Sequence, residues 1–145
     1  MEEYLQKTVD SIVKNKEPLM GGDFTDEDLS VLYSLAFGLY QNGDYEKASE
    51  IFQQLVFSKP FEPKHWQGLA SVLQMQSNYQ NALQAWTMAA MMLDTAEPHF
   101  HAAECLTSLG NKEQAHIALV EAEKRLTQST ADADLKAKIE VLKNV

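Results

Sequence analysis

Residues 41–48 read QNGDYEKA, residues 76–82 read QSNYQNA, and residues 109–115 read LGNKEQA. The three stretches superimpose at a period of about 34 residues, since the alanines that end them are Ala48, Ala82 and Ala115. A bulky residue follows each alanine four positions later, at Phe52, Trp86 and Leu119. Self-similarity at a period of this length predicts an array of repeated structural units.

The repeated unit is a helical hairpin. A small alanine lets two helices cross closely, a Gly or Asn before it permits a tight turn, and the bulky residue fills the space to the next hairpin. The period is that of the tetratricopeptide repeat. We predict an all-α tetratricopeptide-repeat superhelix over residues 25–128, with three hairpins at about 29–62, 63–95 and 96–128. Three repeats are about the minimum for a stable array.

Short signals mark where helices begin. Thr25 precedes three carboxylates at 26–28, which predicts an N-cap followed by a first turn favoured by the helix dipole. Pro60 and Pro63 bracket a stop and a restart, because proline breaks a helix interior but is tolerated in a first turn.

An additional helix is expected at each end of the array. Near the N-terminus, an apolar stripe at helical spacing comprises Leu5, Val9, Ile12 and Val13. A loop with a proline and paired glycines follows, so we interpret residues 1–24 as an amphipathic helix and a hinge. This helix either caps the array, pairs with a second copy of the chain, or does both. At the other end, the stripe Leu135, Ile139 and Leu142 predicts a capping helix within residues 129–145.

The composition excludes several classes of protein. A net charge of -9 disfavours binding to nucleic acid, which depends on clustered Lys and Arg. No run approaches the ~20 apolar residues of a membrane helix, and the first residues lack the features of a signal peptide. Cys105 is the only cysteine in the chain, so no internal disulfide can form. We therefore expect a cytoplasmic protein that does not insert into membranes.

The middle repeat is almost uncharged. Residues 63–95 contain only Lys64 and Asp94 among Lys, Arg, Asp and Glu. Such a surface suits contact with another polypeptide through apolar and hydrogen-bonding groups. The alternative is that this repeat is simply the central one and is flanked by its neighbours.

Catalysis and metal binding find little support. His101 and Cys105 lie four residues apart on one predicted helix face, but the chain offers no glycine-rich strand–turn site, and free cysteine is usually buried. His99 and His101 are two residues apart and point to different sides of a helix. We expect no catalytic site, no metal site and no cofactor.

The candidate site is the concave surface that such arrays use for binding. In the first hairpin, Tyr33, Phe37 and Tyr40 form an aromatic stripe beyond the apolar stripe that packing requires. The alternative is that these rings are buried under the N-terminal helix. The predicted groove continues through polar positions of the later hairpins. Its full set is Tyr33, Phe37, Tyr40, Trp66, Gln67, Ala70, Ser71, Gln74, Phe100, His101 and Glu104.

Two strings carry a resemblance to a known family. The sequences LYSLAF at 32–37 and FHAAEC at 100–105 resemble the class II chaperones of bacterial type III secretion systems, and the similarity covers almost the whole chain. The resemblance implies that the concave face grips an extended segment of hydrophobic translocator proteins in the bacterial cytoplasm. It also implies that Tyr45 belongs to the peptide-binding groove or its edge. It further implies a homodimer formed through the N-terminal helix. The middle repeat departs from a uniformly aromatic groove, because it is rich in Gln and Met.

We therefore predict a non-enzymatic chaperone that keeps its clients soluble and competent for secretion. One alternative is a general tetratricopeptide scaffold that joins folded partners. Scaffolds that clamp a C-terminal carboxylate need Lys or Arg along the groove, and the predicted groove positions contain none. The other alternative, an enzyme built on Cys105, would need a thiol of low pKa.

Overall fold

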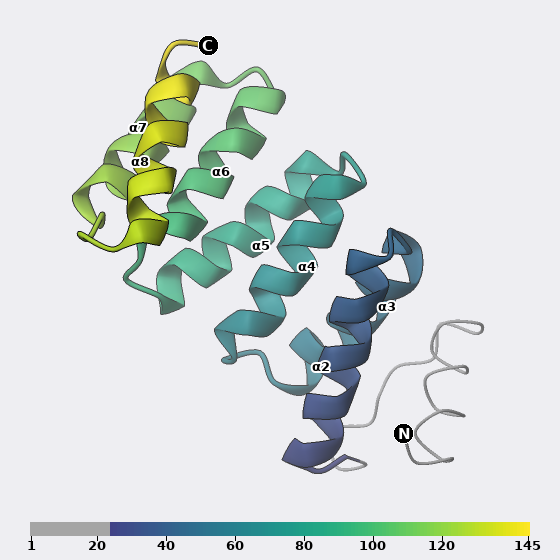
Figure 1. The fold of residues 1–145 in the computed structure, drawn as a ribbon. Helices are drawn as coiled ribbons and strands as arrows, with labels where there is room; N and C mark the ends of the chain where they lie inside the picture. Colours follow the sequence, from purple (N-terminus) through teal and green to yellow (C-terminus); the bar gives the residue numbers. More distant parts are fainter. Residues whose placement is uncertain (1–23) are drawn as a thin grey trace.

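The described part of the chain is an array of α-helices. A computed structural model describes residues 24–145, and these residues form seven helices. They are α2 (Asp26–Gln41), α3 (Tyr45–Ser58), α4 (Pro63–Met75), α5 (Tyr79–Met92), α6 (Ala96–Ser108), α7 (Lys112–Lys124) and α8 (Thr130–Lys143). Successive helices pack against each other from α2 to α7, and α8 packs on α6 and α7 (Figure 1). The predicted all-α array of three hairpins is confirmed.

The predicted N-terminal helix, with its stripe Leu5, Val9, Ile12 and Val13, lies outside the described residues. Within residues 24–145, no helix is both long enough and apolar enough to cross a bilayer.

The helix starts follow the predicted signals. The Asp28 backbone N–H donates to Thr25 Oγ1 at 3.1 Å, and the Thr25 N–H donates to Asp28 Oδ2 at 3.2 Å. This reciprocal capping box satisfies two backbone donors that would otherwise lack partners. Pro63 is the first residue of α4, where its missing N–H costs no hydrogen bond.

The three hairpin turns share one hydrogen-bond pattern. In each turn, the N–H three residues beyond the last helical residue donates at 2.9 Å to the carbonyl five residues earlier, which joins Asp44 to Leu39, Asn78 to Leu73, and Asn111 to Leu106. The pattern requires a left-handed residue in the turn. Gly43 and Gly110 supply it with φ of +83° and +81°, whereas Ser77 adopts φ of +59° in the middle turn. The repeat is therefore present in the backbone as well as in the sequence.

The repeated alanines lie where helices cross. Ala48 and Ala82 have no exposed surface, and Ala115 is only 4% exposed. Gly68 marks an even closer approach, because a Cβ built there would lie 2.3 Å from a ring carbon of Phe52. Helix α4 thus runs directly over the Phe52 ring of α3.

The apolar core has two parts. The larger cluster spans α2 to α5 and reaches Cys105 of α6. The smaller one joins α6, α7 and α8, with Ile139 of α8 fully buried and Leu135 and Leu142 packed against it. The last helix therefore covers the end of the stack, as its apolar stripe predicted.

Candidate peptide-binding groove

A continuous row of aromatic rings follows α2. The ring centroids of Tyr33 and Phe37 are 6.3 Å apart, those of Phe37 and Tyr40 are 6.3 Å apart, and Tyr45 lies 5.9 Å from Tyr40. Phe37 is 42% exposed. Among the described residues, the row is therefore a half-exposed apolar strip and not an interior core.

The row forms one wall of a cavity of about 190 Å³ that gathers residues from five helices. The lining residues are Tyr33, Phe37 and Tyr40 of α2, Phe52 of α3, Gln67, Gly68 and Ser71 of α4, Trp86 of α5, and Glu97 of α6. The Ser71 hydroxyl donates to the Gln67 carbonyl at 2.8 Å, which satisfies it within its own helix. The cavity thus combines aromatic rings with the polar side chains Gln67, Ser71 and Glu97, so it can take an apolar side chain and also offer hydrogen-bonding groups.

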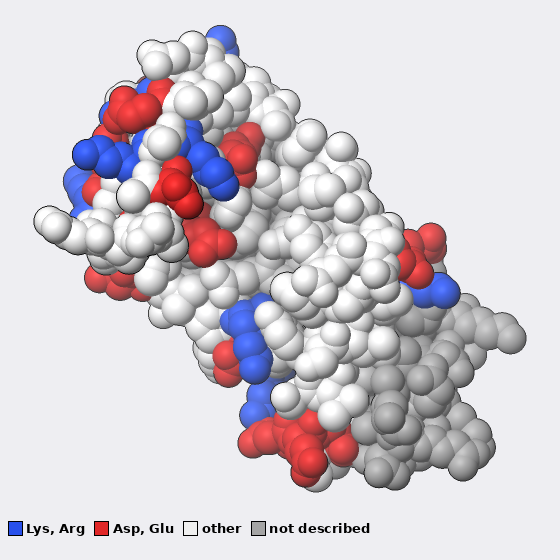
Figure 2. Space-filling view, viewed as in Figure 1, with Lys and Arg blue, Asp and Glu red and all other residues white. Residues whose placement is uncertain are grey.

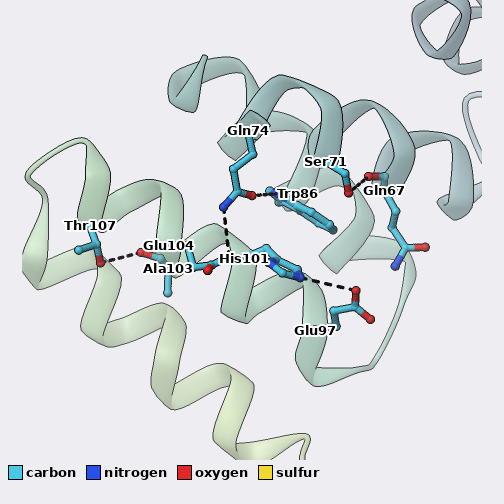
Figure 3. A network of polar contacts seen from close by, with 9 residues as sticks. All are labelled: Gln67, Ser71, Gln74, Trp86, Glu97, His101, Ala103, Glu104 and Thr107. Atoms are coloured by element: carbon cyan, nitrogen blue, oxygen red, sulfur yellow. Dashed lines mark hydrogen bonds and ion pairs between the residues drawn. The ribbon is translucent and has the colours of Figure 1, made fainter. Parts of the chain in front are cut away.

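A hydrogen-bonded network continues from this cavity toward the C-terminal repeat (Figure 3). Trp86 Nε1 donates to Gln74 Oε1 at 2.9 Å, and Gln74 Nε2 donates to Glu104 Oε1 at 3.1 Å. His101 Nδ1 lies 2.6 Å from the same carboxylate oxygen, and its ring stacks on Trp86 with centroids 4.5 Å apart. Glu97 approaches His101 Nε2 at 3.6 Å. Helices α4, α5 and α6 are tied together here.

The network holds His101 protonated at neutral pH. Burial disfavours its charged form, but hydrogen bonds and charge from Glu104 and Glu97 outweigh burial and raise the His101 pKa to about 9. The pKa of Glu97 is lowered by its hydrogen bond to His101. Burial alone would raise the pKa of Glu104, but the bond to His101 lowers it. The network therefore carries two carboxylates around one imidazolium.

The structure separates the predicted groove residues into groups. Tyr33, Phe37, Tyr40, Gln67 and Ser71 share the cavity. Gln74, His101 and Glu104 share the network, in which both polar atoms of the Gln74 amide are already engaged.

Three other predicted groove residues behave differently. Ala70 needs a correction: it has no exposed surface and lies in the core, because it faces the packed side of α4. Trp66 packs on the same core and donates from Nε1 to the Pro60 carbonyl at 2.7 Å. Phe100 is 4% exposed and belongs to the C-terminal core.

Sequence reasoning missed Phe52, Gly68, Trp86 and Glu97. Phe52 and Trp86 were assigned to packing between hairpins, and the structure shows that the same buried rings also form the cavity floor. The glycine inside a helical pattern at position 68 was the available signal, since such a glycine often marks a close approach.

No reactive group lies open in this region. Cys105 has no exposed surface, and burial together with the charge of Glu104 raises the pKa of its thiol to about 12. The imidazole of His101 faces the carboxylates of Glu104 and Glu97, not this thiol. Residues 24–145 contain no group of three or more His, Cys, Asp or Glu placed to hold a metal ion.

Comparisons with known proteins agree with this geometry. A family model of the tetratricopeptide repeat matches residues 31–57 and 63–93. The chain is 32% identical over 141 residues to the low calcium response locus protein H of Yersinia pestis. The alignment covers 95% of this chain and 83% of that protein. The chain is also similar to a crystal structure of the Yersinia enterocolitica type III secretion chaperone SycD in complex with a peptide of the translocator YopD. That structure has a TM-score of 0.80 at 28% identity over 85% of this chain and 95% of SycD.

The chain belongs to the translocator chaperones of type III secretion systems. A second SycD structure, described as an alternative dimer, gives a TM-score of 0.79 at 28% identity over 85% of this chain and 94% of SycD. PcrH of Pseudomonas aeruginosa, solved with the chaperone binding region of PopB, gives 0.77 at 29% identity over 83% of this chain and 98% of PcrH. The resemblance to class II chaperones is thereby confirmed.

Proposed function

We propose that this chaperone binds an extended apolar segment of hydrophobic translocator proteins along its concave face and keeps them soluble and competent for secretion. It does so in the bacterial cytoplasm, without catalytic activity or cofactor. Residues 25–128 form the binding array, residues 129–145 close it, and residues 1–24 mediate assembly.

The half-exposed aromatic row beside the cavity supports this proposal most directly. Three apolar side chains held along Tyr33, Phe37 and Tyr40 would each contribute about 1.5–3 kcal/mol. The cost of association offsets part of this gain, so micromolar affinity is expected for a short peptide. The wall residues come from helices that are tied together, so the site is largely formed before a client arrives.

The charge distribution supports masking as the mode of action. Figure 2 shows mostly uncharged surface over α4 and α5, between charged groups at the C-terminal end of the array and near α2. Exposed apolar segments of a client aggregate unless they are covered. A carrier with a net charge of -9 adds mutual repulsion between complexes. The deeply buried Cys105 thiol gives no support to an enzymatic alternative.

The binding site can be tested with the YopD peptide and with the chaperone binding region of PopB. Tyr40→Ala should weaken binding by about 1–3 kcal/mol, roughly 5- to 150-fold, because a buried aromatic anchor is lost. Phe57→Ala is the matched control, since Phe57 is 68% exposed on α3 and does not line the cavity. Calorimetric titration and a thermal melt of each variant separate binding from folding. Equal affinity of both variants and the wild type would remove the groove assignment.

The assembly role needs a separate test. The apolar stripe Leu5, Val9, Ile12 and Val13 supports a homodimer contact through the N-terminal helix. Deleting residues 1–20 should preserve the helical content of the repeats and lower the apparent mass in sedimentation. The same oligomeric state with and without these residues would refute this role.

A further inference from the structure

A second and larger cavity lies between α6 and α8. Its volume is about 420 Å³, compared with about 190 Å³ beside the aromatic row. Three residues form the α6 side, namely Phe100, His101 and Glu104, and the α8 side comprises Ala137, Lys138, Val141 and Leu142. This volume falls within the ~300–1,000 Å³ typical of pockets that enclose a ligand.

Helix α8 has more apolar surface than capping requires. Its stripe Leu135, Ile139 and Leu142 already packs on the C-terminal core. Ala137 and Val141 are spaced i, i+4 on the adjoining flank, and Val141 is 70% exposed. An isolated exposed valine would need no explanation, but this one stands across a cavity from Phe100.

One face of α6 contributes residues to both cavities. Glu97, His101 and Glu104 are spaced i, i+4, i+7 and lie on that face (Figure 3). Glu97 lines the first cavity, whereas His101 and Glu104 line the second. Lys138 of α8 also lines the second cavity and acts on both carboxylates. His101 and Lys138 thus oppose Glu97 and Glu104, with Asp132 as a further acid that acts on Glu97. The charges largely offset one another, which favours an uncharged occupant.

We propose that the α6–α8 cavity is a second anchor site, which takes an apolar side chain of the same extended client segment. The proposal rests on the proposed function and extends the groove onto α8. Glu97 lines the first cavity and His101 lines the second, and both lie on the same face of α6. One extended segment that crosses this face therefore passes both sites.

A thiol footprint tests whether the client covers α8. Cys105 is the only native cysteine and has no exposed surface, so Val141→Cys introduces a single accessible thiol. A saturating amount of YopD peptide or PopB binding region should slow the alkylation of this thiol by iodoacetamide at least about tenfold. A change of that size means that the thiol is covered in about nine tenths of the protein molecules. Ile117→Cys is the control, since Ile117 is 50% exposed on α7 and lines neither cavity. An alkylation rate at position 141 that bound peptide leaves unchanged overturns the proposal.

Binding measurements on the full chain give an independent check. Val141→Asp should weaken binding of the same probes about tenfold, because it places a charge in an apolar anchor site. Ile117→Asp makes the same change in net charge and should have little effect. Equal losses in both variants would indicate charge alone and overturn the proposal.

The outcomes separate this site from the groove itself. Loss of affinity in Tyr40→Ala with none in Val141→Asp removes the second anchor and leaves the proposed function standing. If neither variant loses affinity, or if the wild type does not bind the probes, both the second anchor and the proposed function are removed.

Discussion

Two glycines in the first helices of successive hairpins, Gly38 of α2 and Gly68 of α4, should respond in opposite ways to the same added methyl group. A Cβ at Gly38 meets nothing within 4 Å. Gly38→Ala should therefore stabilise the protein by about 0.5–1 kcal/mol, because alanine loses less backbone entropy in a helix.

At Gly68 the methyl group meets an occupied space. The built Cβ lies 2.3, 2.6 and 2.7 Å from three ring carbons of Phe52. That ring is 1% exposed and packs edge-on against Tyr33 at 5.8 Å, so it has little room to move. Overpacking costs about 1–3 kcal/mol, and the helix propensity of alanine returns up to about 1 kcal/mol. Gly68→Ala should thus destabilise by about 1–2 kcal/mol.

Thermal melts of both variants beside the wild type measure the difference. For a chain of this size, 1 kcal/mol shifts Tm by roughly 2–4 °C, so the variants should melt about 3–12 °C apart, on opposite sides of the wild type. Urea titration at fixed temperature provides the free energies directly. A Gly68→Ala protein as stable as Gly38→Ala would refute the close approach of α4 to Phe52.

Three further predictions concern the turns, the network and the crossings. Ser77→Gly should raise the free energy of unfolding by up to about 1 kcal/mol, and Tm with it, since Ser77 holds a left-handed backbone; a lower Tm would contradict this. The His101 pKa of about 9 lies above its ordinary value of 6.5, so its stabilisation is complete below pH 6.5 and is lost as the pH rises through 9. Urea unfolding across this pH range should show that the free energy of unfolding of the wild type falls by at most about 3 kcal/mol, whereas that of His101→Gln does not. Parallel pH profiles of the two proteins would exclude this contribution of His101. Ala82→Leu should cost about 1–3 kcal/mol, since Ala82 is fully buried, and an unchanged melt would show that the repeat register is wrong.

Local signals made most of the fold predictable. The alanine period, the glycines of two turns, Thr25 and Pro63 each act within a few residues of their own position, so the sequence reveals them directly. The aromatic row was predictable for the same reason, because Tyr33, Phe37 and Tyr40 share one helix. A helix face follows from spacing alone.

The sequence by itself determined the repeat, the hairpins and the aromatic stripe. Only the tertiary structure decided what those residues meet. Gln74 was expected to face a client, yet its side-chain amide forms hydrogen bonds with Trp86 and Glu104 on two other helices. The capping helix was expected only to close the array, yet its flank at Ala137 and Val141 forms a cavity with α6. Contacts of this kind depend on helix crossing angles and on interaxial distances, which all the packed side chains set together and no local pattern encodes.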